Sequence, residues 1–191
     1  METIDHKKFF YPPGGILIWI IILVEVITFC AGIIAFAWQR NSSVEIFDKA
    51  QKSMQIEIGI ANTLMLLISG FFLAEAVRFI KAGDTVKSQK WTGTAILFGI
   101  GFLVLKGFEY ADKIQHGFDL THNAFYTYYW LLTGFHFLHV ATGLVILSVL
   151  VFKMRRGVYH KNNFFDIETG AAFWHMCDMV WLLLFPVLYL L

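Results

Sequence analysis

Residues 135–150 read FHFLHVATGLVILSVL, a run in which two histidines stand three positions apart among apolar residues. On a helix, His136, His139 and Gly143 fall within about 60° of one another, so they share one face, and Gly143 allows a neighbouring backbone to come close. Imidazoles in such a run either bind a metal or haem or fix neighbouring helices to one another. The stretch therefore predicts a helix whose polar face looks inward, and it leaves the role of the two histidines open.

The rest of the chain is equally apolar. Of its 191 residues 58% are hydrophobic and 20 are phenylalanine, which exceeds what a soluble core of this size can bury. A membrane-spanning helix needs about 20 apolar residues, whereas an outer-membrane barrel needs short segments of alternating polarity, and the sequence has only the first pattern. It predicts an all-α integral membrane protein, a five-transmembrane-helix bundle with an N-terminal segment at 1–15 and a membrane domain at 16–191. The apolar runs lie at 16–38, 58–80, 91–110, 124–152 and 171–191.

Positive charges near the ends of the runs predict the orientation. With a cytoplasmic N-terminus, the inner segments hold ten lysines and arginines, and the outer segments hold four. The N-terminus is therefore expected in the cytoplasm and the C-terminus outside. The formal net charge of +1 and the lack of a basic domain argue against nucleic acid as a partner. The inner ten are Lys7, Lys8, Arg78, Lys81, Lys87, Lys90, Lys153, Arg155, Arg156 and Lys161, and the outer four are Arg40, Lys49, Lys52 and Lys113.

Ionisable side chains inside the runs are the main functional candidates, because each costs about 3 kcal/mol or more in hydrocarbon unless it is paired. Three pairs are spaced i,i+3, so their side chains can meet on one helix face. Such pairs are expected to bridge or neutralise charge locally. They are Glu75 with Arg78, Lys106 with Glu109, and His175 with Asp178.

Glu25 has no such neighbour. It lies nine residues into the first run, about 13 Å from the inner end, and Thr28 is the only other polar residue on its helix face. Either a partner comes from another helix or the carboxyl is protonated at neutral pH. Glu25 is therefore the strongest single functional candidate.

A metal or haem at His136 and His139 would need a further ligand at the same depth. If the last span begins at residue 171, His175 and Asp178 lie about 6 and 11 Å from the inner surface, whereas His139 lies near the membrane middle. This difference in depth argues against a metal site and against a bis-histidine haem. The loop residues His116, Asp119 and His122 are expected to be solvated polar groups.

Several motifs together resemble haem-copper oxidase (cytochrome c oxidase) subunit III. The segment Leu132-Thr133-Gly134-Phe135-His136, followed by Leu138, His139, Val140 and Gly143, is similar to the T-G-h-H-x-L-H-V-x-x-G core of that family. The family's W-H-x-x-D-x-x-W-L-x-x-F-P ending is matched by Trp174, His175, Asp178, Trp181, Leu182, Phe185 and Pro186. Glu25 stands at the family's buried glutamate, and Glu109 with Tyr110 matches its E-Y dipeptide.

The resemblance covers residues 16–191 and implies a non-catalytic subunit of a respiratory electron-transport complex in the bacterial cytoplasmic membrane. The family carries no haem or copper of its own. It packs beside a catalytic subunit that holds haem and, in oxidases, copper, cradles phospholipid, and supports stability and proton uptake. The candidate proton-handling or structural carboxylates are Glu25, Glu75, Glu109 and Asp178. The candidate helix-packing and lipid-contact residues are His136, His139, Gly143, Trp174, His175, Trp181, Arg155 and Arg156, the two arginines because a basic cluster can hold anionic headgroups.

The sequence also departs from the family pattern. The fuller form has seven spans with a lipid cleft between the first two and the last five, whereas this chain has five. Phe137 stands where many members have glycine, and Lys106 stands where others often have glutamine. Five-span members include both bacterial oxidase subunits and the accessory protein encoded with nitric oxide reductase, and the segment TYYWLLTGFHFLHV (127–140) resembles the latter somewhat better. Two other hypotheses stay open: a haem-bearing membrane cytochrome using His136 or His139, and a small proton-conducting or transport bundle centred on Glu25.

Overall fold

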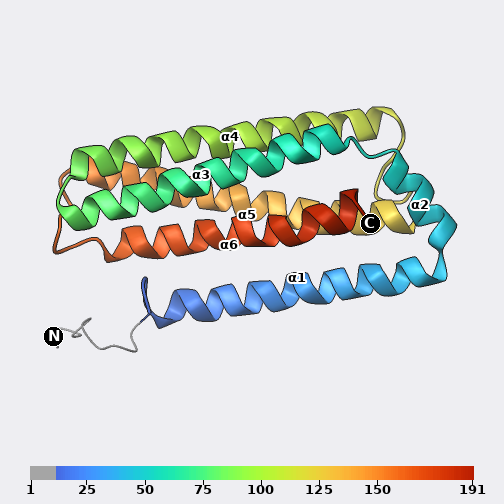
Figure 1. The fold of residues 1–191 in the computed structure, drawn as a ribbon, viewed down its shortest axis with the longest axis horizontal. Helices are drawn as coiled ribbons and strands as arrows, with labels where there is room; N and C mark the ends of the chain where they lie inside the picture. The colour runs from blue at the N-terminus through green and yellow to red at the C-terminus, as the bar shows by residue number, and fades with distance from the viewer. Residues whose placement is uncertain (1–11) are drawn as a thin grey trace.

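The computed structural model describes residues 12–191 and is helical throughout its regular elements (Figure 1). Most of the predicted N-terminal segment 1–15, including Lys7 and Lys8, lies outside the described residues, so these two charges are not placed. The helices are α1 (Ile16–Ser42), α2 (Val44–Lys52), α3 (Ile56–Ala82), α4 (Thr85–Gln115), α5 (Ala124–Arg155) and α6 (Phe165–Tyr189).

Five helices, α1, α3, α4, α5 and α6, are long and apolar enough to cross a membrane, which confirms the five predicted spans. They have 25 to 32 residues. The helices extend past the predicted apolar runs because polar residues at the ends of the runs are also helical or cap the helix. Asp84 caps α4 by accepting a hydrogen bond from the Lys87 amide at 2.9 Å, and Asn123 caps α5 by accepting one from the Tyr126 amide at 3.1 Å. The side-chain and backbone hydrogen bonds from Lys87 lower the pKa of Asp84.

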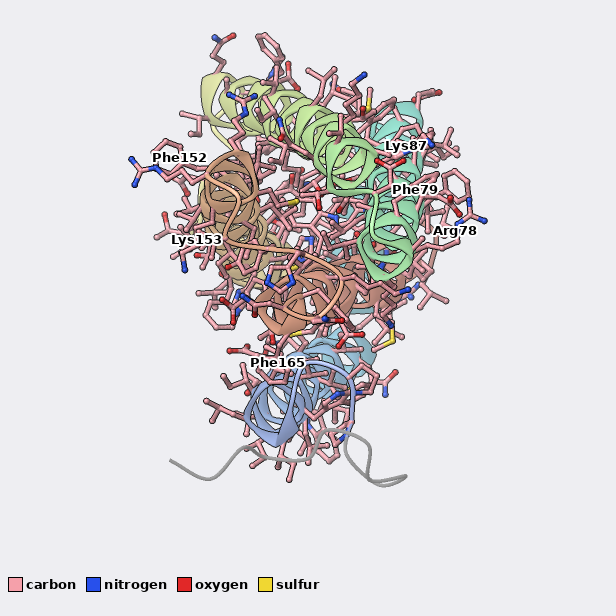
Figure 2. All side chains as sticks on the ribbon, turned by 90° about the vertical axis from the view of Figure 1, so that its left-hand side faces the viewer. Arg78, Phe79, Lys87, Phe152, Lys153 and Phe165 are labelled. Carbon is pink, nitrogen blue, oxygen red and sulfur yellow. The ribbon has the colours of Figure 1, made fainter. Side chains whose placement is uncertain are left out.

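Successive long helices run antiparallel, and α3, α4, α5 and α6 form one four-helix cluster (Figure 1). Seen from the end that holds the α3–α4 and α5–α6 connections, α1 lies to one side of this cluster (Figure 2). It packs on α5 and α6, and its C-terminal half is fixed by Phe36, whose ring meets Phe47 at 5.1 Å and Phe125 at 5.9 Å. Much of the surface of α1 therefore faces away from the bundle.

The nine-residue helix α2 was not predicted, because a search for apolar spans does not detect a short amphipathic helix. It is far too short to cross a bilayer. Phe47 and Ala50 are buried on one side, while Asp48 on the other pairs with Arg40 at 3.1 Å. The helix lies between α1 and α3 and covers the end of the bundle that holds the α4–α5 connection (Figure 1).

Candidate functional site

A closed polar network lies inside the bundle, in the half that holds the α4–α5 connection. We call it the Lys106 cluster: Lys106 and Glu109 of α4, Tyr129 of α5 and Tyr189 of α6. The Lys106 ammonium donates to Glu109 Oε2 at 3.0 Å, to the Tyr129 hydroxyl at 3.2 Å and to the Tyr189 hydroxyl at 2.6 Å. Both hydroxyls donate in turn to Glu109 Oε1, at 2.7 and 2.6 Å. The predicted Lys106–Glu109 pair is therefore confirmed.

The Lys106 cluster satisfies its own charges. An ammonium has three donors, and all three of Lys106 are used; the two charged side chains are fully buried and cancel each other. Rings of Tyr110, Tyr129, Tyr189 and Trp181 also lie within 4.9 to 5.2 Å of the Lys106 nitrogen and favour the cation. The two tyrosines were not predicted, because they come from other helices and no spacing in the sequence links them to Lys106.

Glu25 finds its partner on another helix, as one of the two sequence expectations required. Its Oε2 lies 3.1 Å from His139 Nε2, so the pair joins α1 to α5 within the membrane. The other ring nitrogen of His139, Nδ1, lies 2.8 Å from the Phe135 carbonyl oxygen. A carbonyl only accepts, so Nδ1 carries a hydrogen, and the short Nε2–Oε2 contact then requires one further proton shared between imidazole and carboxyl. The pair is thus a net-neutral site that holds one proton.

His136 packs among aromatic rings. It is buried, and its ring stacks on Trp181 at 5.3 Å and meets the edge of Phe102 at 5.7 Å. Neither ring nitrogen has a hydrogen-bond partner among residues 12–191. These contacts are those of a helix-packing residue.

Gly143 brings α5 and α6 together, as the sequence predicted. A Cβ at this position would lie 2.8 Å from the ring of Trp174, so only glycine leaves room for the indole. Trp174 and Trp181 are both fully buried on the inner face of α6. These two candidate helix-packing residues are therefore part of the packed core.

The predicted depths of His175 and Asp178 are wrong. Rings of α5 and α6 pair His139 with Phe173 at 6.3 Å and His136 with Trp181 at 5.3 Å, so the segment between residues 173 and 181 lies level with the two α5 histidines. The cause is that α6 begins at Phe165, six residues before the apolar run, which moves the pair about 9 Å further along the helix. The i,i+3 contact itself is confirmed, with His175 Nδ1 3.3 Å from Asp178 Oδ2.

His175 and Asp178 lie at the same depth as His136 and His139. Even so, the described residues, 12–191, contain no group of three His, Cys, Asp or Glu side chains that could hold a metal ion. In the outer loop, His116 faces Asp112 at 3.5 Å, whereas Asp119 accepts hydrogen bonds from the amide and hydroxyl of Thr121. Those hydrogen bonds lower the pKa of Asp119. His122 instead packs edge-on against Phe118 at 5.1 Å. The loop residues therefore point to separate local partners.

Ion pairs gather at the end of the bundle that holds the α3–α4 and α5–α6 connections. Glu75 pairs with Arg78 at 2.6 Å, as predicted, and Lys81 pairs with Glu168 at 2.6 Å. Arg155 and Arg156 are exposed, and the Arg156 guanidinium lies 4.2 Å from the centre of the Phe152 ring. This end is therefore rich in exposed cations next to apolar helix surface.

A groove of about 500 Å³ opens at the same end, between α1, α5 and α6. Its walls are apolar, with Ile21, Val149 and Phe173 among them, and Lys153 and Asp166 stand at its polar end. Asp166 accepts a hydrogen bond from the Tyr159 hydroxyl at 2.8 Å. Burial and this hydrogen bond raise the pKa of Tyr159. The groove thus combines apolar walls with a charged rim.

Comparison with known proteins covers the whole membrane region. Residues 15–191 match the family described as cytochrome c oxidase subunit III. Among relatives named cytochrome c oxidase subunit 3, the protein of Synechocystis sp. is 38% identical over 131 residues, which are 68% of this chain and 55% of that protein. The protein of Bacillus sp. (strain PS3) is 32% identical over 145 residues, 74% of this chain and 69% of that protein.

A third relative matches over more of its length. The probable cytochrome c oxidase subunit 3 of Mycobacterium leprae is 28% identical over 177 residues, 92% of this chain and 85% of that protein. The matched segment thus spans about half of the Synechocystis protein and most of the mycobacterial one. Five membrane-spanning helices and a family match from residue 15 to residue 191 lead to one assignment. The chain belongs to the cytochrome c oxidase subunit III family.

Proposed function

We propose that the chain is a non-catalytic accessory subunit of a respiratory haem-copper oxidase in a bacterial cytoplasmic membrane. The observation that carries this proposal is the family match across all five spans. In this proposal the chain binds beside a catalytic subunit, which holds the haem and copper, with its own N-terminus in the cytoplasm and its C-terminus outside. The relatives are named as cytochrome c oxidase subunits, which favours an oxygen-reducing complex over a nitric oxide-reducing one.

The contacts of the intramembrane histidines support an accessory role. His136 is surrounded by aromatic rings, His139 faces Glu25, and His175 faces Asp178. Each therefore has a neighbour within the chain that accounts for its position. This pattern favours helix packing over a haem-bearing cytochrome, and the chain itself needs no prosthetic group for these side chains to be stable.

Phospholipid is the ligand proposed for the groove between α1, α5 and α6. An acyl chain fits its apolar walls, while Lys153 at the rim attracts an anionic headgroup by about 1 kcal/mol, with Arg155 and Arg156 nearby on the same surface. The expected preference is for anionic over zwitterionic lipid.

A role in proton uptake is proposed for the shared proton of Glu25 and His139. The pair is half-buried, and Glu75 lies nearer the inner surface as a second carboxylate. Glu25→Gln keeps a hydrogen-bond acceptor for His139 but removes the titrating group. We expect the variant complex to assemble normally and to take up protons more slowly. Wild-type uptake and a wild-type inactivation rate would leave Glu25 with a structural role only.

Purification tests the assignment as a subunit. The tagged full chain, extracted in mild detergent, should comigrate with a haem-bearing subunit, and the complex should reduce oxygen. If the purified complex reduces nitric oxide instead of oxygen, it is a nitric oxide reductase complex. Migration as a free chain in every mild detergent would contradict the accessory role.

A further inference from the structure

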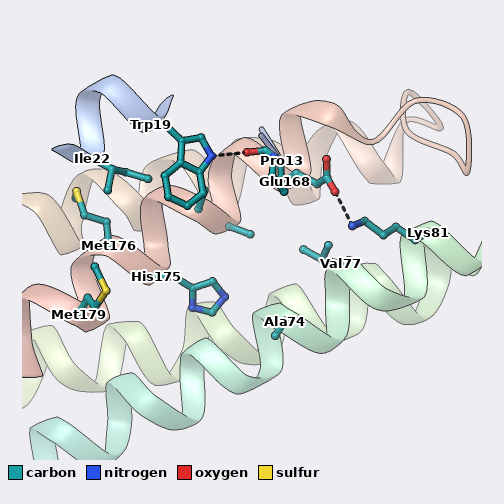
Figure 3. A pocket seen from close by; sticks show the side chains of 12 residues that line it. Pro13, Trp19, Ile22, Ala74, Val77, Lys81, Glu168, His175, Met176 and Met179 are labelled. Carbon is teal, nitrogen blue, oxygen red and sulfur yellow. Dashed lines mark hydrogen bonds and ion pairs between the residues drawn. The ribbon is translucent and has the colours of Figure 1, made fainter. Parts of the chain in front are cut away.

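A second groove, of about 440 Å³, opens between α1, α3 and α6 (Figure 3). This size is typical of small-molecule sites. Most of its lining is apolar, with Ile22, Val77, Met176 and Met179 among the walls. His175 also lines it, with 45% of its side chain exposed. A half-exposed imidazole in an otherwise apolar, membrane-embedded groove suggests that the groove binds more than a hydrocarbon chain.

The two nitrogens of His175 differ in their surroundings. Nδ1 lies 3.3 Å from Asp178 Oδ2 on the same helix. The ring projects from α6 toward α3 into the groove (Figure 3), and no hydrogen bond to Nε2 occurs among residues 12–191. Within the described part of the chain, the second carboxyl oxygen, Asp178 Oδ1, is buried without a hydrogen-bond partner. Unused hydrogen-bonding capacity at the groove wall therefore belongs to His175 Nε2, whereas that of Asp178 lies in the buried interior.

Burial in the membrane decides what His175 offers to a ligand. A net charge on the His175–Asp178 pair is costly in hydrocarbon, so the pair as a whole is neutral. The imidazole and the carboxyl group then carry two titratable protons between them. With one proton shared between Nδ1 and Asp178 Oδ2, as imidazolium with carboxylate or as imidazole with carboxylic acid, Nε2 carries a hydrogen. The groove thus presents one N–H donor, which selects a ligand with an acceptor such as a carbonyl oxygen.

The depth of His175 separates this ligand from a phospholipid headgroup. The rim of the groove is marked by the Lys81–Glu168 ion pair (Figure 3). His175 follows Glu168 by seven residues on α6, about 10 Å deeper along the helix. A phosphate at the rim does not reach that depth, so the acceptor must belong to a neutral group that is soluble in the membrane interior.

Trp19 indicates which ligand shape the groove favours. Its indole lines the groove, and Nε1 donates to the Pro13 carbonyl at 2.9 Å, which turns the hydrogen-bonding edge away to the backbone and leaves a ring face for contact (Figure 3). Flat rings pack well on such a face. A flat ring with carbonyl oxygens and an apolar tail fits the indole, the half-exposed N–H donor of His175 and the apolar walls.

We propose that this groove binds an isoprenoid quinone, with one ring carbonyl accepting a hydrogen bond from His175 Nε2 and the tail lying along the apolar walls. The site is distinct from the phospholipid groove, which lies on the other side of α1 and ends at Lys153. The proposal concerns binding alone and requires no electron transfer within this chain.

Photolabelling in native membranes tests it. The probe is a benzoquinone with a decyl tail and an azido group, and labelled peptides of the full chain are identified by mass spectrometry. We expect label in the α6 segment 165–189 and, as for loss of a ligand contact, at least about tenfold less label in His175→Phe. Ala172→Phe fills the groove and leaves His175 and Asp178 themselves unsubstituted, and it should have the same effect. His175→Gln should retain part of the labelling, because its amide is still a donor.

Matched controls are His116→Phe and Ala111→Phe, the same substitutions at exposed positions near the other end of the bundle. They should label like the wild type, and unlabelled decyl quinone should compete where phosphatidylglycerol does not. Even labelling of all lipid-facing peptides, equal competition by phosphatidylglycerol, or unchanged labelling in Ala172→Phe would each overturn the proposal. Because comigration with a haem subunit is a separate readout, failure here leaves the accessory role standing.

Discussion

Removing one charge from the Lys106 cluster should destabilise the protein more than removing both. Lys106→Met leaves Glu109 fully buried without its countercharge, and Glu109→Leu does the same to Lys106. Breaking one partner of a buried ion pair costs about 3–5 kcal/mol. The remaining tyrosine hydroxyls still bind the orphaned charge, so we expect the lower end, about 3 kcal/mol for each single variant.

The double variant Lys106→Met/Glu109→Leu removes both charges and leaves two tyrosine hydroxyls without charged partners. Hydrogen bonds between side chains in membrane proteins are worth about 0.6 kcal/mol on average and up to about 1.7. We therefore expect the double variant to lose about 1–3 kcal/mol. This is well below the sum of the single losses, so the two residues should show a coupling energy of about 3 kcal/mol or more.

The two cysteines provide the assay. Cys177 is fully buried and Cys30 is half-buried; both are free thiols. In a Cys30→Ala background, a maleimide dye that fluoresces on reaction reports the exposure of Cys177 during heating in detergent. A loss of about 3 kcal/mol corresponds to a midpoint lower by roughly 6–12 °C for a chain of this size.

Lys87→Met is the matched control. It removes a lysine from an i,i+3 pair of similar length, 2.8 Å to Asp84, but at an exposed site where the pair contributes about 1 kcal/mol or less. The reasoning is refuted if Lys106→Met melts like Lys87→Met. It is also refuted if the effects of Lys106→Met and Glu109→Leu simply add in the double variant, because independent losses would mean that the two charges do not stabilise each other.

Three further predictions concern other parts of the chain. Gly143→Ala places a methyl group 2.8 Å from Trp174 and should cost about 1–3 kcal/mol, whereas Gly134→Ala, where nothing lies within 4 Å, should be neutral or slightly stabilising in the same dye assay; equal effects would contradict the close packing of α5 on α6. Glu25→Leu should lower the melting point by more than Glu25→Gln does, because only glutamine keeps an acceptor for His139. The lowered pKa of Asp84 means that its cap stabilises the start of α4 above about pH 4 and is lost as the pH falls below that value. Hydrogen exchange of the Lys87 amide should therefore show less protection at pH 3 than at pH 5 once corrected for intrinsic rates, and equal protection would exclude Asp84 as the cap.

The spans and the i,i+3 pairs were predictable because both depend on local sequence. An apolar run of about 20 residues is read directly, and a pair such as His175 with Asp178 needs only the helical repeat. The position of Gly143 against a neighbouring helix was also predictable, since small residues on a polar helix face mark close approach. Each of these statements concerns a single helix.

What the sequence did not reveal depends on how the helices are arranged. Glu25 was known to need a partner, but only the packing of α1 on α5 identifies His139. Tyr129 and Tyr189 contact Lys106 from two other helices, and no spacing in the sequence links them to Lys106. The start of α6 at Phe165 was missed because the polar residues Asp166 and Glu168 interrupt the apolar run, which misplaced His175 in depth.

The central claim is that neighbouring helices, and no prosthetic group, satisfy the ionisable side chains within this subunit. Optical spectra and metal analysis of the isolated full chain, after separation from the subunit with which it comigrates, test this most directly. We predict no Soret band and no stoichiometric iron or copper in the chain, with the haem remaining in its partner. A haem spectrum that stays with the chain and disappears in His136→Ala or His139→Ala would contradict the claim.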